Sequence, residues 1–271
     1  MKEATLDIFM NHQVTFWRPD SEVHEYHKLV VEEPLFIHLH NRPIYTTMRT
    51  PGDEIALAAG FCLSQGIINH PDDVESFDFD DKTAPNLVNV TLKSSARGKT
   101  GGRYKEGFEV HEPDRGCAER LIDELFRSVG PASDNHPIDI ARAFECIDTL
   151  SDHQELRRFT RASHAAAAYS SHYDLLSVSE DVGRHNALDK SIGKLLLSGG
   201  LPQTAFLALS SRISFELVQK AARAHIPTII SVSRPTAFAV RLASKLNMTL
   251  ACLAKGPGLY IFCGHHRLTD S

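Results

Sequence analysis

The chain has 271 residues, of which 42% are apolar, and this is enough for a folded core in one large domain or two small ones. Its formal net charge of -5 disfavours nucleic acid or an anionic membrane as a partner of the whole molecule. No apolar stretch approaches the roughly 18 residues needed to cross a bilayer, so we expect no membrane-spanning segment.

The first residues and the cysteines both indicate the cytoplasm. Glu3 and Asp7 stand where a signal peptide needs a basic start and a long apolar run. The five cysteines are odd in number, widely scattered and never spaced as C-x-x-C. This pattern is typical of reduced thiols in a reducing compartment.

Residues 1–135 are predicted to form a small α+β domain. The β-rich runs at 35–39 and 87–92 predict strands, and the small apolar residues at 54–65 predict a helix that Asp53 can cap. Residues 93–116 are polar and contain several glycines, without the apolar periodicity of packed structure. We therefore expect a mobile loop there.

Residues 136–271 show a different pattern, which is typical of an α/β domain. Apolar positions at helical spacing predict a linking helix at 137–150. Beyond it, strands and helices alternate, which indicates a largely parallel sheet with helices on its faces. The predicted strands are 175–178, 205–209, 228–232 and 249–254, and the predicted helices are 186–197, 214–224 and 236–246.

Three turns follow these strands, and each combines serine or glycine with arginine. Parallel strands would bring all three turns to one carboxyl edge, where α/β proteins form ligand crevices. Free backbone N–H groups at helix starts favour phosphate, and guanidinium groups add charge-assisted hydrogen bonds. The alternative is that the serines are ordinary N-caps and the arginines pair with carboxylates such as Glu180 or Glu216. The predicted binding residues are Gly183, Arg184, Ser210, Ser211, Arg212, Ser233 and Arg234.

Cys117 follows the polar loop and starts a helix-like run with apolar positions 118, 121, 122 and 125. A thiol at a helix N-terminus near arginines has a lowered pKa and a larger thiolate fraction. Such a thiolate can accept sulfane sulfur as a persulfide, so Cys117 is the predicted catalytic residue. The alternative is a small filler on the flank of an amphipathic helix.

Five short motifs occur in order along the chain: TPGD at 50–53, SHAAA at 163–167, EDVGRHNALDK at 180–190, SSR at 210–212 and VQKA at 218–221. Together they resemble the formate dehydrogenase accessory sulfurtransferase (FdhD/NarQ) family. The resemblance implies a cytidine-deaminase-like, three-layer α/β/α domain at 136–271. It also singles out His164 and His185, which stand inside the matching motifs, and it adds His185 to the predicted cofactor-binding residues.

The function implied by the resemblance is that of an accessory sulfur carrier, with Cys117 as the sulfur acceptor. Sulfur would pass from a cysteine desulfurase to the molybdenum bis-guanine-dinucleotide cofactor destined for formate dehydrogenase. GDP would be a surrogate ligand for the cofactor's guanine nucleotides, and the protein would be a homodimer. The chain departs from the family at Arg120, where a second cysteine usually stands.

Two other functions are weighed against this one. Loss of the second cysteine fits a non-enzymatic chaperone that binds and delivers the molybdenum cofactor. A zinc deaminase fits poorly, because His185 is followed by Asn186-Ala187 in place of the catalytic glutamate and no P-C-x-x-C follows. His265-His266 has no spaced partner ligands, so we expect no zinc.

Overall fold

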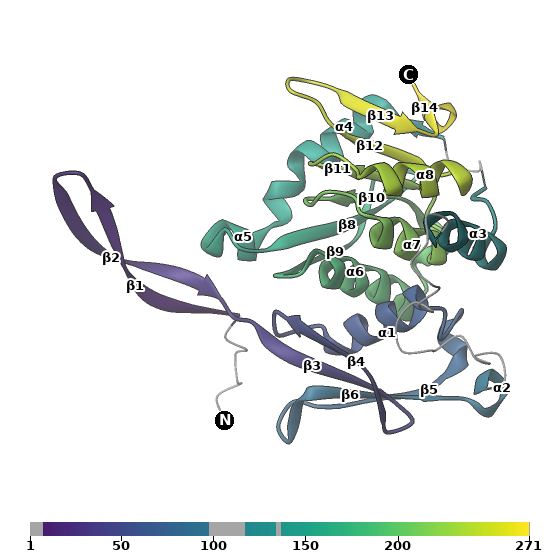
Figure 1. The fold of residues 1–271 in the computed structure, drawn as a ribbon, viewed down its shortest axis with the longest axis horizontal. Helices are drawn as coiled ribbons and strands as arrows, with labels where there is room; N and C mark the ends of the chain where they lie inside the picture. Colours follow the sequence, from purple (N-terminus) through teal and green to yellow (C-terminus); the bar gives the residue numbers. More distant parts are fainter. Residues whose placement is uncertain (1–7, 98–116, 134–136, 271) are drawn as a thin grey trace.

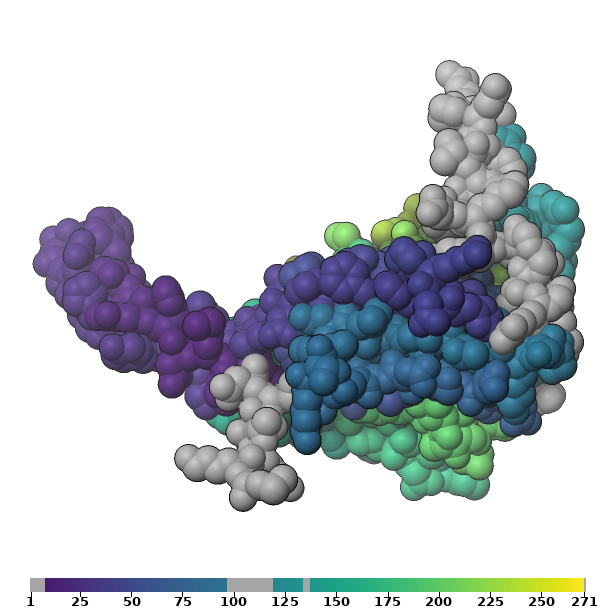
Figure 2. All heavy atoms as spheres, turned by 90° about the horizontal axis from the view of Figure 1, so that it is seen from below, coloured from purple at the N-terminus to yellow at the C-terminus, as the bar shows by residue number. Residues whose placement is uncertain are grey.

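A computed structural model describes residues 8–97, 117–133 and 137–270 of the chain. The N-terminal strands β1 (Phe9–Arg18) and β2 (Ser21–Val30) pair antiparallel as a hairpin. The hairpin projects from the body of the molecule as a long arm (Figures 1 and 2). It returns to the body through β2, whose Lys28 ammonium lies 4.0 Å from the ring centre of Phe159.

A four-stranded sheet follows, in the order β4-β3-β6-β5. Its strands β3 (Glu33–Leu39) and β6 (Ala84–Leu92) are parallel, and helix α1 (Glu54–Ser64) lies in the connection that parallel neighbours require. This confirms the predicted strands and helix. The remaining elements of this part are β4 (Arg42–Arg49), η1 (Pro71–Asp73) and β5 (Val74–Asp80).

Two sequence predictions in this region need correction. Asp53 stands at the N-cap of α1 but makes no side-chain cap; its φ is 60°, and its carboxylate lies 2.7 Å from Lys194 Nζ instead. The predicted loop at 93–116 begins with a short helix, α2 (Ser94–Arg97), because Ala96 is buried and its N–H donates to Lys93 O. Residues 98–116 lie outside the described part of the chain.

The central six-stranded sheet has the order β13-β12-β11-β10-β8-β9. All four predicted strands form and run in the same direction: β9 and β10 are both antiparallel to β8, and β10, β11 and β12 are parallel. Two strands of this sheet were not predicted: β8, which lies between β9 and β10, and the edge strand β13. The strands are β8 (His164–Ser170), β9 (Leu175–Asp181), β10 (Thr204–Leu209), β11 (Thr228–Ser231), β12 (Thr249–Leu253) and β13 (Leu259–Cys263).

The predicted helices that follow the strands also form, with η3 (Leu201–Gln203) between the first two. They are α6 (Arg184–Ser198), α7 (Phe215–Arg223) and α8 (Ala237–Lys245). The predicted linking helix starts later than expected, because its first residues form the short strand β7 (Ile138–Asp139) and the Asp139 side chain caps α4. The remaining elements are α3 (Cys117–Val129), α4 (Ile140–Asp148), η2 (Thr149–His153), α5 (Glu155–Thr160), η4 (His265–Arg267) and β14 (Leu268–Thr269), which pairs with β7.

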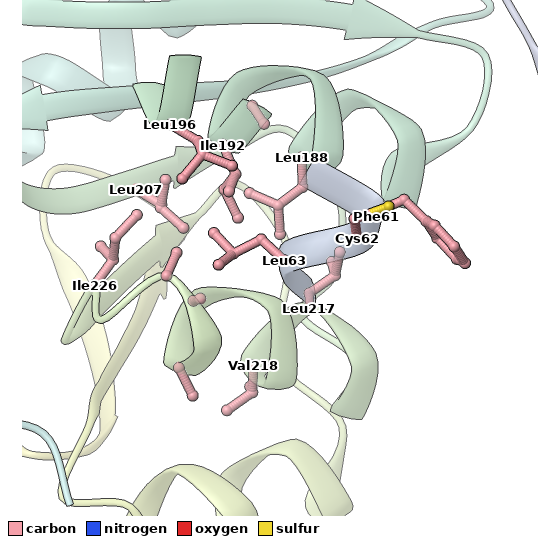
Figure 3. Close-up of a cluster of buried hydrophobic side chains, with 14 of the residues drawn as sticks. Phe61, Cys62, Leu63, Leu188, Ile192, Leu196, Leu207, Leu217, Val218 and Ile226 are labelled. Atoms are coloured by element: carbon pink, nitrogen blue, oxygen red, sulfur yellow. The ribbon is translucent and has the colours of Figure 1, made fainter. Parts of the chain in front are cut away.

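Buried apolar side chains fill both faces of the central sheet. On one face, side chains from α1, α6, α7 and the sheet form a continuous core around Cys62, Leu188 and Leu207 (Figure 3). A smaller cluster on the other face packs α4 against Tyr169 and Phe206. The mixed α/β class is thus confirmed. The cytidine-deaminase-like layering and the domain boundary at 135/136 stay predictions, and the larger core contains residues from both sides of that boundary.

Helices α1 and α6 pack closely enough for their backbones to touch. A Cβ added to Gly60 would lie 1.9 Å from the carbonyl oxygen of Asp189, and one added to Gly193 would lie 1.8 Å from that of Ala56. Both helices therefore need glycine at the crossing point. This contact fixes the position of α6, which begins at the turn predicted to bind ligand.

Candidate functional site

The predicted turns converge at one edge of the central sheet. Strands β9, β10 and β11 run in the same direction, so the turns at Gly183, Ser211 and Arg234 leave the sheet at their common carboxyl edge. This convergence is as predicted. Strand β8 runs the opposite way and begins there, which brings His164 beside Asp181 in the ladder. We call this group of turns, together with the start of β8, the carboxyl edge.

The turn after β9 is organised by one fully buried carboxylate, that of Asp181. It accepts hydrogen bonds from the backbone N–H groups of Thr50 and Gly183, at 3.1 and 2.9 Å, and from the Asn186 side chain at 3.1 Å. Lys190 Nζ lies 2.7 Å from it and is itself buried. The TPGD turn and the EDVGRHNALDK motif are therefore one hydrogen-bonded unit, which holds Arg184 and His185 at the start of α6.

The carboxyl edge is rich in positive charge. The pKa of His185 is lowered to about 4, first by burial and then by the nearby charges of Arg184, Lys220 and Arg212, against the opposing effect of Glu216. Burial also lowers the pKa of His164, with Arg157 and Arg184 adding to the effect. Both histidines are thus neutral at pH 7, and the arginines carry the charge of the site.

Several buried polar atoms at this edge lack partners. Within the described residues, Arg184 Nε and His164 Nδ1 are buried without any hydrogen bond. His185 Nε2 has only long contacts, 3.4 Å to Ser214 Oγ and 3.8 Å to Glu216 Oε2. Buried polar atoms without a partner carry a desolvation cost, and an anionic ligand would remove that cost for the Arg184 Nε–H donor.

The alternative interpretation of the arginines does not match these contacts. In the described part of the chain, none of Arg184, Arg212 and Arg234 has a carboxylate within 4.0 Å, although the charge of Arg184 contributes to the lowered pKa of Glu216. Arg234 lies over the Tyr260 ring at 5.5 Å. The Glu180 carboxylate is taken by other donors, namely the backbone N–H groups of Leu156 and Arg157 and the Ser163 hydroxyl, at 2.6 to 2.9 Å.

The predicted serines serve the backbone of the turns. Ser210 Oγ accepts the N–H of Ala165 at 2.8 Å, which ties the turn after β10 to β8. Ser211 Oγ donates to the carbonyl oxygen of Arg212 at 3.1 Å. The carbonyl of Ser233 accepts a hydrogen bond from the Ser231 hydroxyl. These serines shape the turns, so the arginines and histidines are the stronger candidates for ligand contact.

Sequence reasoning missed Arg157 as part of this site. Helix α5 lies beside the start of β8, and Arg157 Nη1 donates to the carbonyl of Ser163 at 2.8 Å. Its charge reaches His164. The available signal was the cluster of Arg157, Arg158 and Arg161 immediately before the SHAAA motif.

Helix α3, which starts at Cys117, is not brought to the carboxyl edge. It packs on α8 through ion pairs of Glu119 with Arg241, at 2.5 Å, and of Asp123 with Lys245, at 3.5 Å. In Figure 1, α5 lies near the left end of the central strands and α3 near the right end. The structure describes α3 from Cys117 onward, in agreement with the predicted helix. The residues before Cys117 and the Cys117 side chain lie outside the described part of the chain, so the helix start and the lowered pKa stay predictions.

Comparison with known proteins identifies the family. The model of the FdhD/NarQ family matches residues 30–269. The chain belongs to the FdhD/NarQ family. A protein of Streptomyces avermitilis named sulfur carrier protein FdhD is 33% identical over 273 residues, covering 93% of this chain and 90% of that protein. The protein of that name from Mycolicibacterium paratuberculosis is 36% identical, covering 89% of this chain and 91% of that protein.

A solved structure supports the fold of this FdhD/NarQ member. The crystal structure of a candidate formate dehydrogenase accessory protein from Desulfotalea psychrophila matches it with a TM-score of 0.78. The match covers 97% of this chain and 100% of that one, at 22% sequence identity, so it shows a shared fold. None of the helices in the described ranges is long and apolar enough to cross a membrane.

Proposed function

We propose that this FdhD/NarQ member is a sulfur carrier in the maturation of formate dehydrogenase. The observation that carries the proposal is its similarity, over about nine-tenths of the chain, to proteins named sulfur carrier protein FdhD. The fold shared with the Desulfotalea psychrophila protein supports the link to formate dehydrogenase. We propose a cytoplasmic homodimer with two partners, a cysteine desulfurase as sulfur donor and formate dehydrogenase as client.

Cys117 is the proposed sulfur acceptor. Its thiolate would attack the terminal sulfur of a donor persulfide, form a Cys117 persulfide and release the donor's thiolate. Its predicted place at the N-terminus of α3 supports this step, because a helix N-terminus stabilises a thiolate.

The test incubates the protein with a cysteine desulfurase and cysteine and then measures the intact mass. An addition of about 32 Da, one sulfur atom, is expected on Cys117. The matched control is Cys146→Ser, which removes a partly buried thiol on α4 and should leave the addition unchanged. An addition that persists in Cys117→Ser rules out Cys117 as the carrier.

The proposed cargo is the molybdenum bis-guanine-dinucleotide cofactor, bound through its phosphates at the carboxyl edge. Support comes from the unpaired donor of Arg184 and from the exposed guanidinium groups of Arg212 and Arg234 on adjacent turns. GDP is the surrogate ligand, and it should bind in a calorimetric titration. Replacing Arg212 and Arg234 together by alanine should abolish most of that binding. Binding that survives the double change refutes the location.

A second candidate function is a chaperone that delivers the cofactor without sulfur chemistry. The observation in its favour is Arg120, which occupies the place of the family's second cysteine and leaves no resolving thiol beside Cys117. GDP binding without any persulfide on Cys117 would select this function. The two tests are independent, because α3 lies apart from the carboxyl edge.

A further inference from the structure

A pocket lies beside the carboxyl edge, and the proposed function does not use it. Its volume is about 430 Å³, and it is lined by Ser151, Gln154, Arg157, Arg158 and Arg161. We propose that this pocket, here called the α5 pocket, is a second oxyanion site that binds a phosphate or diphosphate group. This goes beyond sulfur transfer and stands whether or not Cys117 carries sulfur.

The backbone of α5 gathers the three arginines around the pocket. Arg157 and Arg158 belong to the helix, and the chain then turns into the left-handed conformation at Arg161, where φ is 56°. The N–H of Arg161 closes this turn by donating to Arg157 O at 2.7 Å. The helix is held against the sheet by Glu180, which accepts the Leu156 and Arg157 N–H groups. The positions of the three arginines around the pocket are thus fixed by the attachment of α5 to the sheet.

Gln154 supplies the second indication of a ligand. Its side chain is only 6% exposed, and within the described residues its Nε2 has no hydrogen-bond partner. A buried amide donor without an acceptor costs free energy that a bound oxyanion would recover after a small rotation of the amide. Ser151 adds a hydroxyl donor at the same rim.

The charge of the pocket selects a multiply charged anion. Three guanidinium groups line it, and the one carboxylate paired with them among the described residues is Glu155, 3.8 Å from Arg158 in an exposed contact. The Glu180 carboxylate also lies close by and keeps its charge, because its donors, the Leu156 and Arg157 N–H groups and the Ser163 hydroxyl, are neutral. The three guanidinium groups therefore exceed the two carboxylates by about one positive charge, and guanidinium groups bind phosphate in a bidentate geometry. The volume exceeds that of one phosphate, so a diphosphate fits.

Two sources could supply such a group: free pyrophosphate, or the phosphates of a guanine nucleotide whose other parts reach the carboxyl edge. Arg157 connects the two places, since it lines the pocket and its charge lowers the pKa of His164. Calorimetric titrations with pyrophosphate, GDP and guanosine distinguish the sources. Low ionic strength is needed, because exposed charges are screened within about 10 Å at 0.1 M salt.

The test variant replaces Arg158 and Arg161, both exposed, by alanine. Its matched control replaces Arg42 and Arg127, exposed arginines on β4 and α3, and has the same net charge. Pyrophosphate affinity should fall about tenfold or more in the test variant, as expected for the loss of charge-assisted hydrogen bonds, and stay unchanged in the control. Arg161→Glu should abolish binding, and thermal unfolding verifies that each variant is folded.

The possible results of these titrations distinguish the two ligand sources from each other and from a wrong proposal. Loss of both pyrophosphate and GDP binding in the test variant supports a nucleotide phosphate in the α5 pocket, and loss of pyrophosphate alone supports an independent oxyanion site. The proposal is wrong if the test variant binds pyrophosphate as the intact protein does, or if only the Arg212→Ala, Arg234→Ala protein loses it. That last result would still leave the carboxyl edge as the nucleotide site, so the two proposals fail separately.

Discussion

The crossing of α1 and α6 gives the sharpest test of how the site is positioned. In Gly193→Ala, the added Cβ would lie 1.8 Å from the carbonyl oxygen of Ala56. Such contacts need about 3 Å, so the helices must move apart by more than about 1 Å in a close-packed core. Because the clash is with backbone, no side-chain rotation relieves it. The cost of this overpacking is therefore at the upper end of the usual range, about 3 kcal/mol, and the helix propensity of alanine recovers about 1 kcal/mol of it.

We therefore expect a net loss of about 2 kcal/mol in the free energy of unfolding, measured by urea denaturation followed by circular dichroism. The control is Gly199→Ala at the C-cap of the same helix, where φ is 75° and nothing lies within 4 Å of the added methyl. It should cost about 1 kcal/mol, the penalty of a left-handed backbone alone. Equal or smaller destabilisation by Gly193→Ala than by Gly199→Ala would refute the close-contact argument. GDP affinity should also fall in Gly193→Ala, since α6 carries Arg184 at its start.

Three further predictions concern buried titratable groups. Lys190→Met leaves the Asp181 carboxylate buried without its cation and should cost about 3–5 kcal/mol in urea denaturation. Lys194→Met breaks the partly exposed pair with Asp53 and should cost less than about 1 kcal/mol; equal losses in the two variants would contradict this. The pKa of His185 is about 4 in the folded protein and about 6.5 when unfolded, so the unfolded state binds more protons between these values. The free energy of unfolding should therefore fall as the pH drops from 6.5 to 4. His185→Gln should reduce the slope of the free energy of unfolding against pH. An NMR titration of His185 centred near pH 6.5 would disprove the lowered pKa. Burial raises the pKa of Cys62 to about 12, and iodoacetamide at pH 8 should alkylate it only in urea, as peptide mapping will show.

Much of the central domain could be predicted from local pattern. Apolar runs of four to six residues followed by amphipathic segments gave the correct strands and helices from β9 to β12. Because those strands run in one direction, the convergence of Gly183, Ser211 and Arg234 also followed from the sequence. Short-range periodicity records which face of an element is buried, and α/β alternation then constrains the direction of each strand.

Strand β8 shows where that reasoning ends. Its residues 165–168 are four alanines, which favour helix over strand, yet they are almost fully buried between β9 and β10. Alanine fits there because neighbouring elements pack close to both faces of the sheet. The residues that favour a strand here therefore belong to the neighbouring elements, so the sequence of the segment alone does not predict it. The insertion of β8 is also what brings His164 to the carboxyl edge.

The sequence by itself determined the family motifs, the α/β character of the second half and the set of arginines that follow its strands. Only the tertiary structure decided which donors of these arginines lack partners and that Glu180 anchors α5. It also decided that Asp53 pairs with Lys194 instead of capping α1, and that α3 lies away from the carboxyl edge. The physical reason is that local propensity acts over a few residues. Charge pairing, desolvation and close packing depend on groups that are more than 100 residues apart in the chain and meet only in the folded core, as Thr50 and Asp181 do.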